Sequence, residues 1–340
     1  MRFSRIAKLL VFSAITSIAL SPSSWAQKAQ LKPVTLVLEW TGFQPQHFGF
    51  WIAKERGWYA DEGLDVTIKN SGGSTQAMQI LTGGQAQFAN VAASALVQAA
   101  GRGSAPLKMV AMFSQKDSMS MAYFESSGIK TPKNLEGRKM GLVPGSVAFL
   151  LWPSFAKANN IDISKVSIKS WDFRSYYGIF GAKQVDVAGN FTLGSTGEWL
   201  FKQRGETVRQ FVFSDSVPVL GTGIVVRGDL IKSDPDLIRH FVKATQRAWA
   251  YLATDSKSAV PEAAKIVHQQ FDETPAPEII AEYAYEMIPG RMLVAQPGKP
   301  QGWSDPAEWS KMIDLLKTYD TEMTTTPTPG DVMTNDFLSK

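Results

Sequence analysis

Short hydrophobic runs alternate with longer amphipathic segments over the first two thirds of the chain. Runs such as 34–38 and 64–68 are rich in β-branched residues and have the length of buried strands. Because strands alternate with helices, the pattern predicts an α/β fold with mainly parallel sheets. The predicted strands are 34–38, 64–68, 87–91, 108–113, 139–143, 166–170, 185–190 and 224–227. The helices predicted between them include one that follows the turn 71–75 and ends near 82, and others at 93–100, 147–159 and 176–181.

The pattern changes after residue 233 to long amphipathic segments. Asp234 and Asp305 each precede a proline, which is the arrangement of N-cap and first residue with which many helices begin. The helices predicted here are 235–254, 257–270, 276–288 and 306–319. The final segment, 324–340, is rich in threonine and proline and is predicted to be a loop-like C-terminal tail.

The N-terminus has the three parts of an export signal. Arg2, Arg5 and Lys8 give a positive start, residues 9–20 are mostly apolar, and Ser24 and Ala26 place small residues where a signal peptidase cleaves. The apolar stretch has 12 residues, too few for a membrane-spanning helix, which needs about 20. We therefore expect residues 1–26 to be a cleavable signal peptide, with no lipid anchor because no cysteine follows it.

This signal accounts for most of the chain's basic character. The full chain has 35 Lys and Arg against 31 Asp and Glu, a net charge of +4. Residues 1–26 hold three of the basic residues and no acidic ones, so the mature chain carries 32 against 31, or +1. A nearly neutral chain gives no electrostatic reason to expect a nucleic-acid partner.

Cysteine is absent from the chain. Its absence excludes disulfides, iron–sulfur clusters, cysteine-ligated zinc and thiol nucleophiles. The three histidines leave little for a histidine-rich metal site. The nucleophile-elbow, zinc-protease and phosphate-loop motifs do not occur either, so we predict neither catalytic residues nor a metal or cofactor.

Motifs in order along the whole mature chain carry a family resemblance. The segment EWTGFQPQHFGFWIAKERGWYADEGLDVTI, residues 39–68, resembles the opening of periplasmic solute-binding proteins for thiamine-precursor pyrimidines, sulfonates and taurine. In that family a strand ends in Asp-Trp, where this chain has Glu39 and Trp40. Further segments that resemble the family are 72–89, 128–146, 181–189 and 222–255.

The resemblance implies a two-lobed periplasmic-binding-protein fold, similar to type II, in which each lobe holds a mainly parallel sheet flanked by helices. Two crossovers would join the lobes, and a small ligand would be captured between them as they close. It also implies a periplasmic, monomeric protein that delivers its ligand to an ABC permease with a cytoplasmic ATPase. The implied parts are a first lobe at 31–121 plus 224–323, a second lobe at 122–223, and the tail at 324–340.

Candidate binding residues follow the predicted strands, because ligands of open α/β sheets lie where strands end and helices begin. Trp40 has a ring that can stack on a planar ligand, and Glu39 or His47 can hydrogen-bond its nitrogens. The alternative is that Trp40 belongs to the core and His47 is an exposed loop residue. The full candidate set is Glu39, Trp40, His47, Gly73, Ser74, Thr75, Asn90, Gln115, Ser146, Trp171, Asn190 and Glu198.

Three members of this set have their own alternatives. Ser74 and Thr75 can serve as ordinary helix N-caps instead of binding a ligand. Glu198 lies where pyrimidine-binding relatives often have a cleft glutamate, and its alternative is a solvated helix residue.

The candidate set contains two carboxylates and two tryptophans but no Arg or Lys. A sulfonate is a strong acceptor and is best bound by arginine or by several helix N-termini. The set therefore favours a planar, nitrogen-containing ligand such as a pyrimidine, with an organosulfonate or aromatic acid as the alternative. Two other classes stay open. One is a ligand sensor for a membrane receptor, and the other is an enzyme like the superfamily's thiamine-pyrimidine synthase, which uses lysine-bound pyridoxal phosphate and a cysteine-rich motif.

Overall fold

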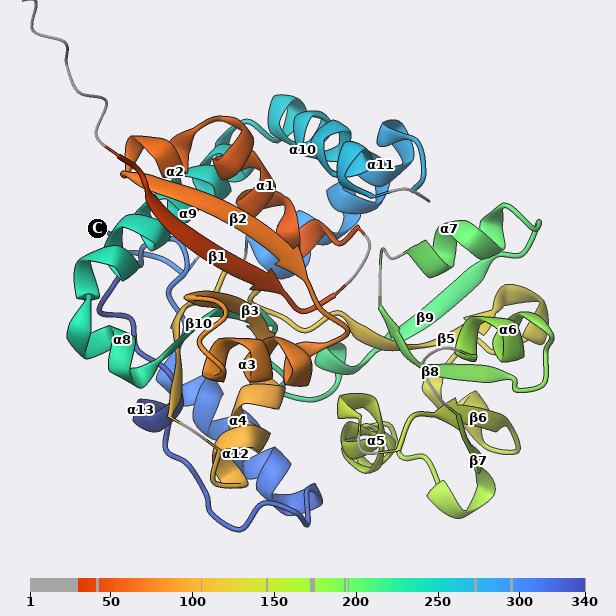
Figure 1. Cartoon of the computed structure of the whole chain (residues 1–340). Helices are drawn as coiled ribbons and strands as arrows, with labels where there is room; N and C mark the ends of the chain where they lie inside the picture. The colour runs from red at the N-terminus through yellow and green to blue at the C-terminus, as the bar shows by residue number, and fades with distance from the viewer. Residues whose placement is uncertain are drawn as a thin grey trace, which may run out of the picture. The chain divides into compact units, whose positions relative to one another are not determined.

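Two five-stranded sheets carry the fold, as seen in a computed structural model (Figure 1). The structure describes residues 30–339 except 41–42, 105, 145, 172–174, 193, 195, 272–273 and 294–295. The predicted signal peptide, 1–26, lies outside the described residues. None of the described helices is both long and apolar enough to cross a membrane.

The first sheet has the strand order β2-β1-β3-β10-β4. Its strands β1, β2 and β3 are parallel, and β10 runs antiparallel to both of its neighbours. The strands are β1 (Lys32–Leu38), β2 (Leu64–Asn70), β3 (Phe88–Ala92), β4 (Leu107–Ala111) and β10 (Thr222–Arg227).

The second sheet repeats this plan with the order β7-β6-β8-β5-β9. Here β5 is the antiparallel strand. Its strands are β5 (Met119–Phe124), β6 (Lys139–Leu142), β7 (Ser167–Ser170), β8 (Val187–Thr192) and β9 (Val208–Val212). In each sheet, the antiparallel strand is the first strand that the chain forms after crossing from the other sheet. The prediction of mainly parallel sheets is therefore confirmed, with one reversed strand in each that the sequence did not show. The predicted lobe boundaries at 121/122 and 223/224 fall within β5 and β10 and stay predictions.

Helices surround both sheets (Figure 1). Asp234 and Asp305 cap their helices as predicted, because their carboxylates accept hydrogen bonds from Leu237 N at 3.2 Å and Ala307 N at 2.9 Å. The α-helices are α1 (Phe48–Glu55), α2 (Trp58–Asp61), α3 (Ser74–Thr82), α4 (Ala93–Gly101), α5 (Val147–Ala158), α6 (Tyr176–Gly181), α7 (Thr196–Lys202), α8 (Gly228–Ser233), α9 (Pro235–Thr254), α10 (Ser256–Gln270), α11 (Pro277–Met287), α12 (Pro306–Tyr319) and α13 (Pro329–Val332). Short 3-10 turns are η1 (Pro45–His47), η2 (Glu125–Ser127), η3 (Pro132–Leu135), η4 (Ile163–Lys165) and η5 (Phe213–Asp215), and η6 (Ile288–Met292) is a π-helical turn that extends α11.

The C-terminal segment is more ordered than the predicted loop-like tail. It forms α13, and Met333 pairs with Met109 of β4 in a parallel bridge. Val332 and Phe337 are buried. The apolar residues are too widely spaced among threonine and proline to give a periodic signal, so burial against the first sheet decides this structure.

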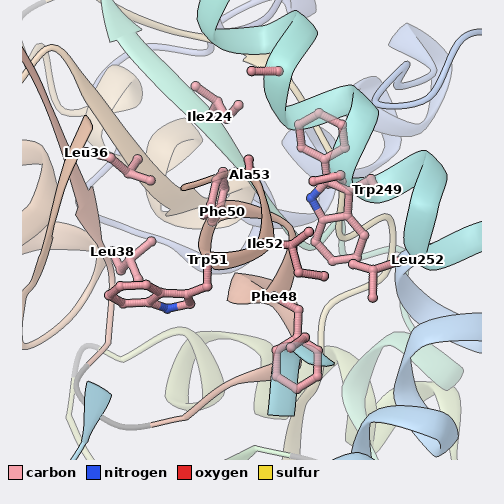
Figure 2. Close-up of a cluster of buried hydrophobic side chains, with 14 of the residues drawn as sticks. Leu36, Leu38, Phe48, Phe50, Trp51, Ile52, Ala53, Ile224, Trp249 and Leu252 are labelled. Carbon is pink, nitrogen blue, oxygen red and sulfur yellow. The ribbon is translucent and has the colours of Figure 1, made fainter. Parts of the chain in front are cut away.

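One hydrophobic core packs α1 and α9 against the first sheet. Figure 2 shows Trp249 of α9 facing Phe48 and Ile52 of α1. A Cβ at Gly49 would lie 2.3 Å from Trp249 Nε1, so only glycine lets these two helices approach so closely. A second core runs from the other face of the first sheet to the second sheet through α5 and α12, and a third lies within the second sheet's own helices.

Candidate functional site

The carboxyl ends of β1 and β3 bring three of the predicted residues together. These strands are parallel neighbours with Leu36 opposite Phe88, so Glu39 and Asn90 reach the same edge of the sheet. His47 Nε2 lies 3.0 Å from Glu39 Oε2, and Asn90 Nδ2 donates to the same oxygen at 2.7 Å. Because an ionised carboxylate only accepts hydrogen bonds, Nε2 carries the histidine proton. All three side chains are buried, which corrects the alternative of an exposed His47.

The environment of Glu39 holds its carboxyl in the ionised form. Burial alone would raise its pKa, but the nearby His47 and the hydrogen bonds from His47, Asn90 and its own backbone outweigh burial and lower the pKa below the usual 4.5. The result is a buried negative charge at the end of β1.

Asp117, on the crossover from β4 to β5, is a second buried carboxyl near this charge. Burial raises its pKa to about 6, the Met119 N–H and Arg291 lower it, and the charge of Glu39 raises it further. Its Oδ1 accepts a hydrogen bond from Met119 N at 2.6 Å. No motif in the sequence marks Asp117 as a site residue.

The turn between β1 and α1 buries polar atoms that have no partner in the described part of the chain. They are Gln44 Oε1, Gln46 Oε1 and His47 Nδ1. No motif in the sequence marks the two glutamines. Trp40 precedes this turn and is half-buried.

The start of α3 is held in place by a serine. Gly73 is the N-cap residue with φ +145°, a conformation that favours glycine. Ser74 Oγ accepts a hydrogen bond from Ala92 N at 3.1 Å and so ties α3 to the end of β3. Thr75 is exposed. The alternative of N-capping by Ser74 or Thr75 is therefore wrong, because the N-cap position is occupied by glycine.

Gln115 stabilises the crossover from β4 to β5 through hydrogen bonds to backbone carbonyls. Its Nε2 donates to the carbonyls of Met112 at 2.5 Å and Trp303 at 3.0 Å. Its backbone N–H donates to Arg291 O at 2.8 Å. Gln115 was predicted to contact a ligand, but its side-chain Nε2 already donates to two backbone carbonyls.

Arg291 of η6 links this crossover to the second sheet. Its guanidinium donates to Asp117 O at 3.2 Å, Ser214 Oγ at 2.7 Å and Asp215 Oδ1 at 2.9 Å. Arg291 therefore lies near the site, but its guanidinium already donates hydrogen bonds to residues of the crossover and of η5.

The ends of β6 and β8 bring two further predicted residues together. Asn190 Nδ2 donates to Ser146 Oγ at 2.7 Å, and Asn190 Oδ1 accepts from Val143 N at 3.0 Å. Ser146 also caps α5 by accepting from Phe149 N at 3.2 Å. Asn190 has φ +66°, which is uncommon for a residue other than glycine, and its amide contacts stabilise this backbone.

Trp171 belongs to the core of the second sheet. The side chain is 7% exposed and lies among Ala122, Phe180 and Ala188. A Cβ at Gly141 would lie 2.5 Å from the Trp171 ring, so the ring covers the glycine. The predicted role of Trp171 as a second aromatic face for the ligand is therefore not supported by its burial.

We expect Gly141→Ala to lower the free energy of unfolding by about 1–3 kcal/mol, because the added methyl overpacks the contact with Trp171. Gly178→Ala is the control, since a Cβ there meets no atom within 4 Å. Urea denaturation of both variants measures the difference. An unchanged midpoint for Gly141→Ala would show that Trp171 moves aside without cost.

Glu198 of α7 lies at a contact with α11. Its Oε1 accepts hydrogen bonds from Gly194 N at 2.8 Å and from Gln210 Nε2. Burial raises its pKa to about 7, with the charge of Glu286 adding to the effect. A Cβ at Gly194 would lie 2.3 Å from Met287 Sδ, so the loop before α7 packs closely on α11. Glu198 is thus half-buried and hydrogen-bonded rather than fully solvated.

Two surface cavities lie away from these residues. One, of about 310 Å³, is lined by charged side chains of α9 and the C-terminal segment. The other, of about 360 Å³, lies between α4 and the segment 325–331. Neither is lined by a predicted site residue.

Known proteins resemble this chain in sequence and in fold. The 4-amino-5-hydroxymethyl-2-methylpyrimidine phosphate synthase THI13 of Saccharomyces cerevisiae is 22% identical over 244 residues, which cover 66% of this chain and 68% of the yeast protein. The periplasmic aliphatic sulphonate binding protein SsuA from Escherichia coli aligns with a TM-score of 0.65 at 13% identity, over 87% of this chain and 89% of that chain. The periplasmic nitrate-binding protein NrtA from Synechocystis PCC 6803 aligns with a TM-score of 0.64 at 13% identity, over 91% and 87%.

These structural likenesses confirm the predicted two-lobed periplasmic-binding-protein fold. The sequence comparison adds the family. A family model described as NMT1/THI5 like matches residues 44–259, more than half of the chain, and the chain therefore belongs to the NMT1/THI5-like family.

Proposed function

We propose that this protein is the periplasmic ligand-binding component of an ABC importer and captures a small planar, nitrogen-containing molecule of the pyrimidine type as its lobes close. The observation that carries the proposal is the buried network of Glu39, His47 and Asn90 at the end of β1, directly beside Trp40. An ionised carboxylate attracts a ligand that donates hydrogen bonds or carries positive charge. A ligand that also touches the second lobe would favour the closed state.

The charges at this edge of the sheet favour such a ligand over an oxyanion. Glu39 and Asp117 are both acidic, and the Arg291 guanidinium is engaged by Asp215, Ser214 and a backbone carbonyl. The structural relatives named for sulphonate and nitrate keep an oxyanion as the alternative ligand class.

Export and delivery complete the proposal. The predicted signal peptide at 1–26 and the likeness to periplasmic binding proteins support a periplasmic location and a partner permease with its ATPase. The twelve predicted site residues remain the proposed ligand contacts, except where the structure gives them another role, as for Trp171 and Gln115.

An enzymatic function is the second candidate, because the yeast relative is named a synthase. The chain has no cysteine to form the cysteine-rich motif of that enzyme type. Incubation of the protein with any ligand that it binds, followed by mass spectrometry, separates the two. Turnover of the ligand would contradict the binding-protein proposal.

A thermal-shift screen tests the proposal directly. Pyrimidines, flavins, sulfonates and aromatic acids are the probes. A ligand at about 100 times its Kd stabilises the folded protein by roughly 2.7 kcal/mol, which gives a clear rise in Tm. Stabilisation by a pyrimidine is the expected result, and stabilisation by sulfonates alone would favour the oxyanion alternative.

Trp40→Ala should weaken binding of the best probe by about 1–3 kcal/mol, roughly 5- to 150-fold in Kd, because the aromatic ring that stacks on the ligand is lost. Calorimetry measures the change. Trp303→Ala is the control, since Trp303 is also half-buried but packs against Lys299. Equal affinities of Trp40→Ala and the unaltered protein would remove Trp40 from the site.

A further inference from the structure

The turn that precedes α1 contains three buried polar residues within four positions of the chain. Gln44 precedes η1, and Gln46 and His47 belong to it, with His47 N donating to Gln44 O at 2.9 Å. All three residues are buried: Gln44 is 4% exposed, Gln46 8% and His47 1%. The turn packs against α1, α11 and η6, so its conformation is held from several sides.

Each of these side chains keeps a buried polar atom without a hydrogen bond. The atoms are Gln44 Oε1, Gln46 Oε1 and His47 Nδ1, and no partner for them exists in the part of the chain that the structure describes. Buried polar groups in folded proteins are nearly always paired, so an unpaired cluster needs a reason. Sites that bind ligands supply such a reason, because the ligand completes the hydrogen bonds.

The cluster is continuous with the charged network at the end of β1. His47 uses its other nitrogen to bond Glu39, so its ring connects one of the unpaired atoms, Nδ1, to the buried carboxylate. A group that paired with the turn would therefore lie beside a negative charge. Gln44 and Gln46 belong to the same turn as His47, three residues and one residue before it, although they carry no sequence motif.

We propose that Gln44 and Gln46 determine which class of ligand this protein accepts. This inference rests on the proposed function. Whichever way a carboxamide is turned, it has one carbonyl that only a donor can satisfy and one amino group that needs an acceptor. It therefore matches a ligand edge on which an N–H lies next to an acceptor, as in an amino group beside a ring nitrogen or in an amide.

An oxyanion such as a sulfonate or nitrate offers acceptors only. It would leave the buried carbonyls of Gln44 and Gln46 unpaired and would lie beside the Glu39 carboxylate. The two glutamines therefore act against such ligands as well as in favour of amino heterocycles and amides.

Calorimetry with four probes tests the inference. The probes are 4-amino-5-hydroxymethyl-2-methylpyrimidine, its analogue without the amino group, methanesulfonate and nitrate. We expect the unaltered protein to bind the amino compound about tenfold or more tightly than its analogue and to bind the two anions most weakly. In Gln44→Leu and Gln46→Leu, affinity for the amino compound should fall about tenfold, and the preference over the analogue should shrink.

Gln98→Leu is the matched control. Gln98 is also buried, but its Nε2 already donates to Asp320 Oδ2 at 3.1 Å. We expect this variant to lose thermal stability and keep its affinity, whereas Gln44→Leu and Gln46→Leu should keep or gain stability in the absence of ligand.

The outcomes separate the inference from the proposed function. If the unaltered protein binds the amino compound and both leucine variants bind it equally well, the glutamines pair only with buried water and the inference is wrong. A preference of the unaltered protein for methanesulfonate or nitrate would also overturn it, while ligand capture itself would stand. Failure of all four probes to bind would overturn the proposed function together with the inference.

Discussion

Glu39→Ala lowers the free energy of unfolding by about 3–5 kcal/mol at neutral pH. The substitution removes an acceptor that two buried donors share, His47 Nε2 at 3.0 Å and Asn90 Nδ2 at 2.7 Å. Both donors would then be buried without a partner, and each such loss costs about 1–3 kcal/mol. Urea denaturation followed by tryptophan fluorescence measures the change.

Glu39→Gln is the informative companion, because its carbonyl oxygen can still accept from both donors. We expect it to cost less than Glu39→Ala. Glu55→Ala at an exposed position of α1 serves as the control for a lost carboxylate and should change stability by less than about 0.5 kcal/mol. Equal stability of Glu39→Ala and Glu55→Ala would contradict the network.

The same network gives a pH dependence at the acid end. The folded protein holds the pKa of Glu39 below its usual 4.5, so the unfolded chain binds the proton more readily. The stability from this group is therefore present above about pH 4.5 and is lost as the pH falls through the lowered pKa. Glu39→Gln removes this part of the acid dependence. Denaturation curves of both proteins between neutral pH and about pH 3 provide the comparison.

The topology explains which part of the site could be predicted from sequence. Glu39 and Asn90 follow two strands, and the parallel register of β1 and β3 brings strand ends to one edge. His47 joins them because the turn η1 folds back over that edge. Strand ends indicated Glu39 and Asn90, and the family resemblance indicated His47. The register of β1 and β3 brings Glu39 and Asn90 close enough to hydrogen-bond.

Other features depend on contacts that are distant in sequence. Strands β5 and β9 were not predicted, because β5 has no β-branched residue and both are stabilised by pairing within the second sheet. Gln44 and Gln46 carry no sequence motif, and packing of α1, α11 and η6 on the turn buries them. Trp171 follows a strand as a ligand-stacking residue would, but the small residue Gly141 on β6 gives its ring a place in the core.

The unaltered protein becomes less stable as the pH rises toward neutrality, and Glu198→Gln abolishes this decrease. Burial raises the pKa of Glu198 from 4.5 to about 7, and the charge of Glu286 on α11 contributes to the rise. Between these values the folded protein binds the proton more tightly than the unfolded chain, so stability falls with increasing pH. The fall amounts to about 3 kcal/mol and is complete just above pH 7.

Glutamine keeps the acceptor for Gly194 N and Gln210 Nε2 but cannot ionise. Urea denaturation at about pH 5 and about pH 8 should therefore show a smaller stability difference in Glu198→Gln than in the unaltered protein, by about 3 kcal/mol. Glu286→Gln should give an intermediate result, because it removes one cause of the raised pKa and leaves burial in place. Glu55→Gln at an exposed position of α1 is the control. The same pH dependence in the unaltered protein and in Glu198→Gln would mean that Glu198 ionises as in water, and that its contact with α11 does not bury the carboxyl in solution.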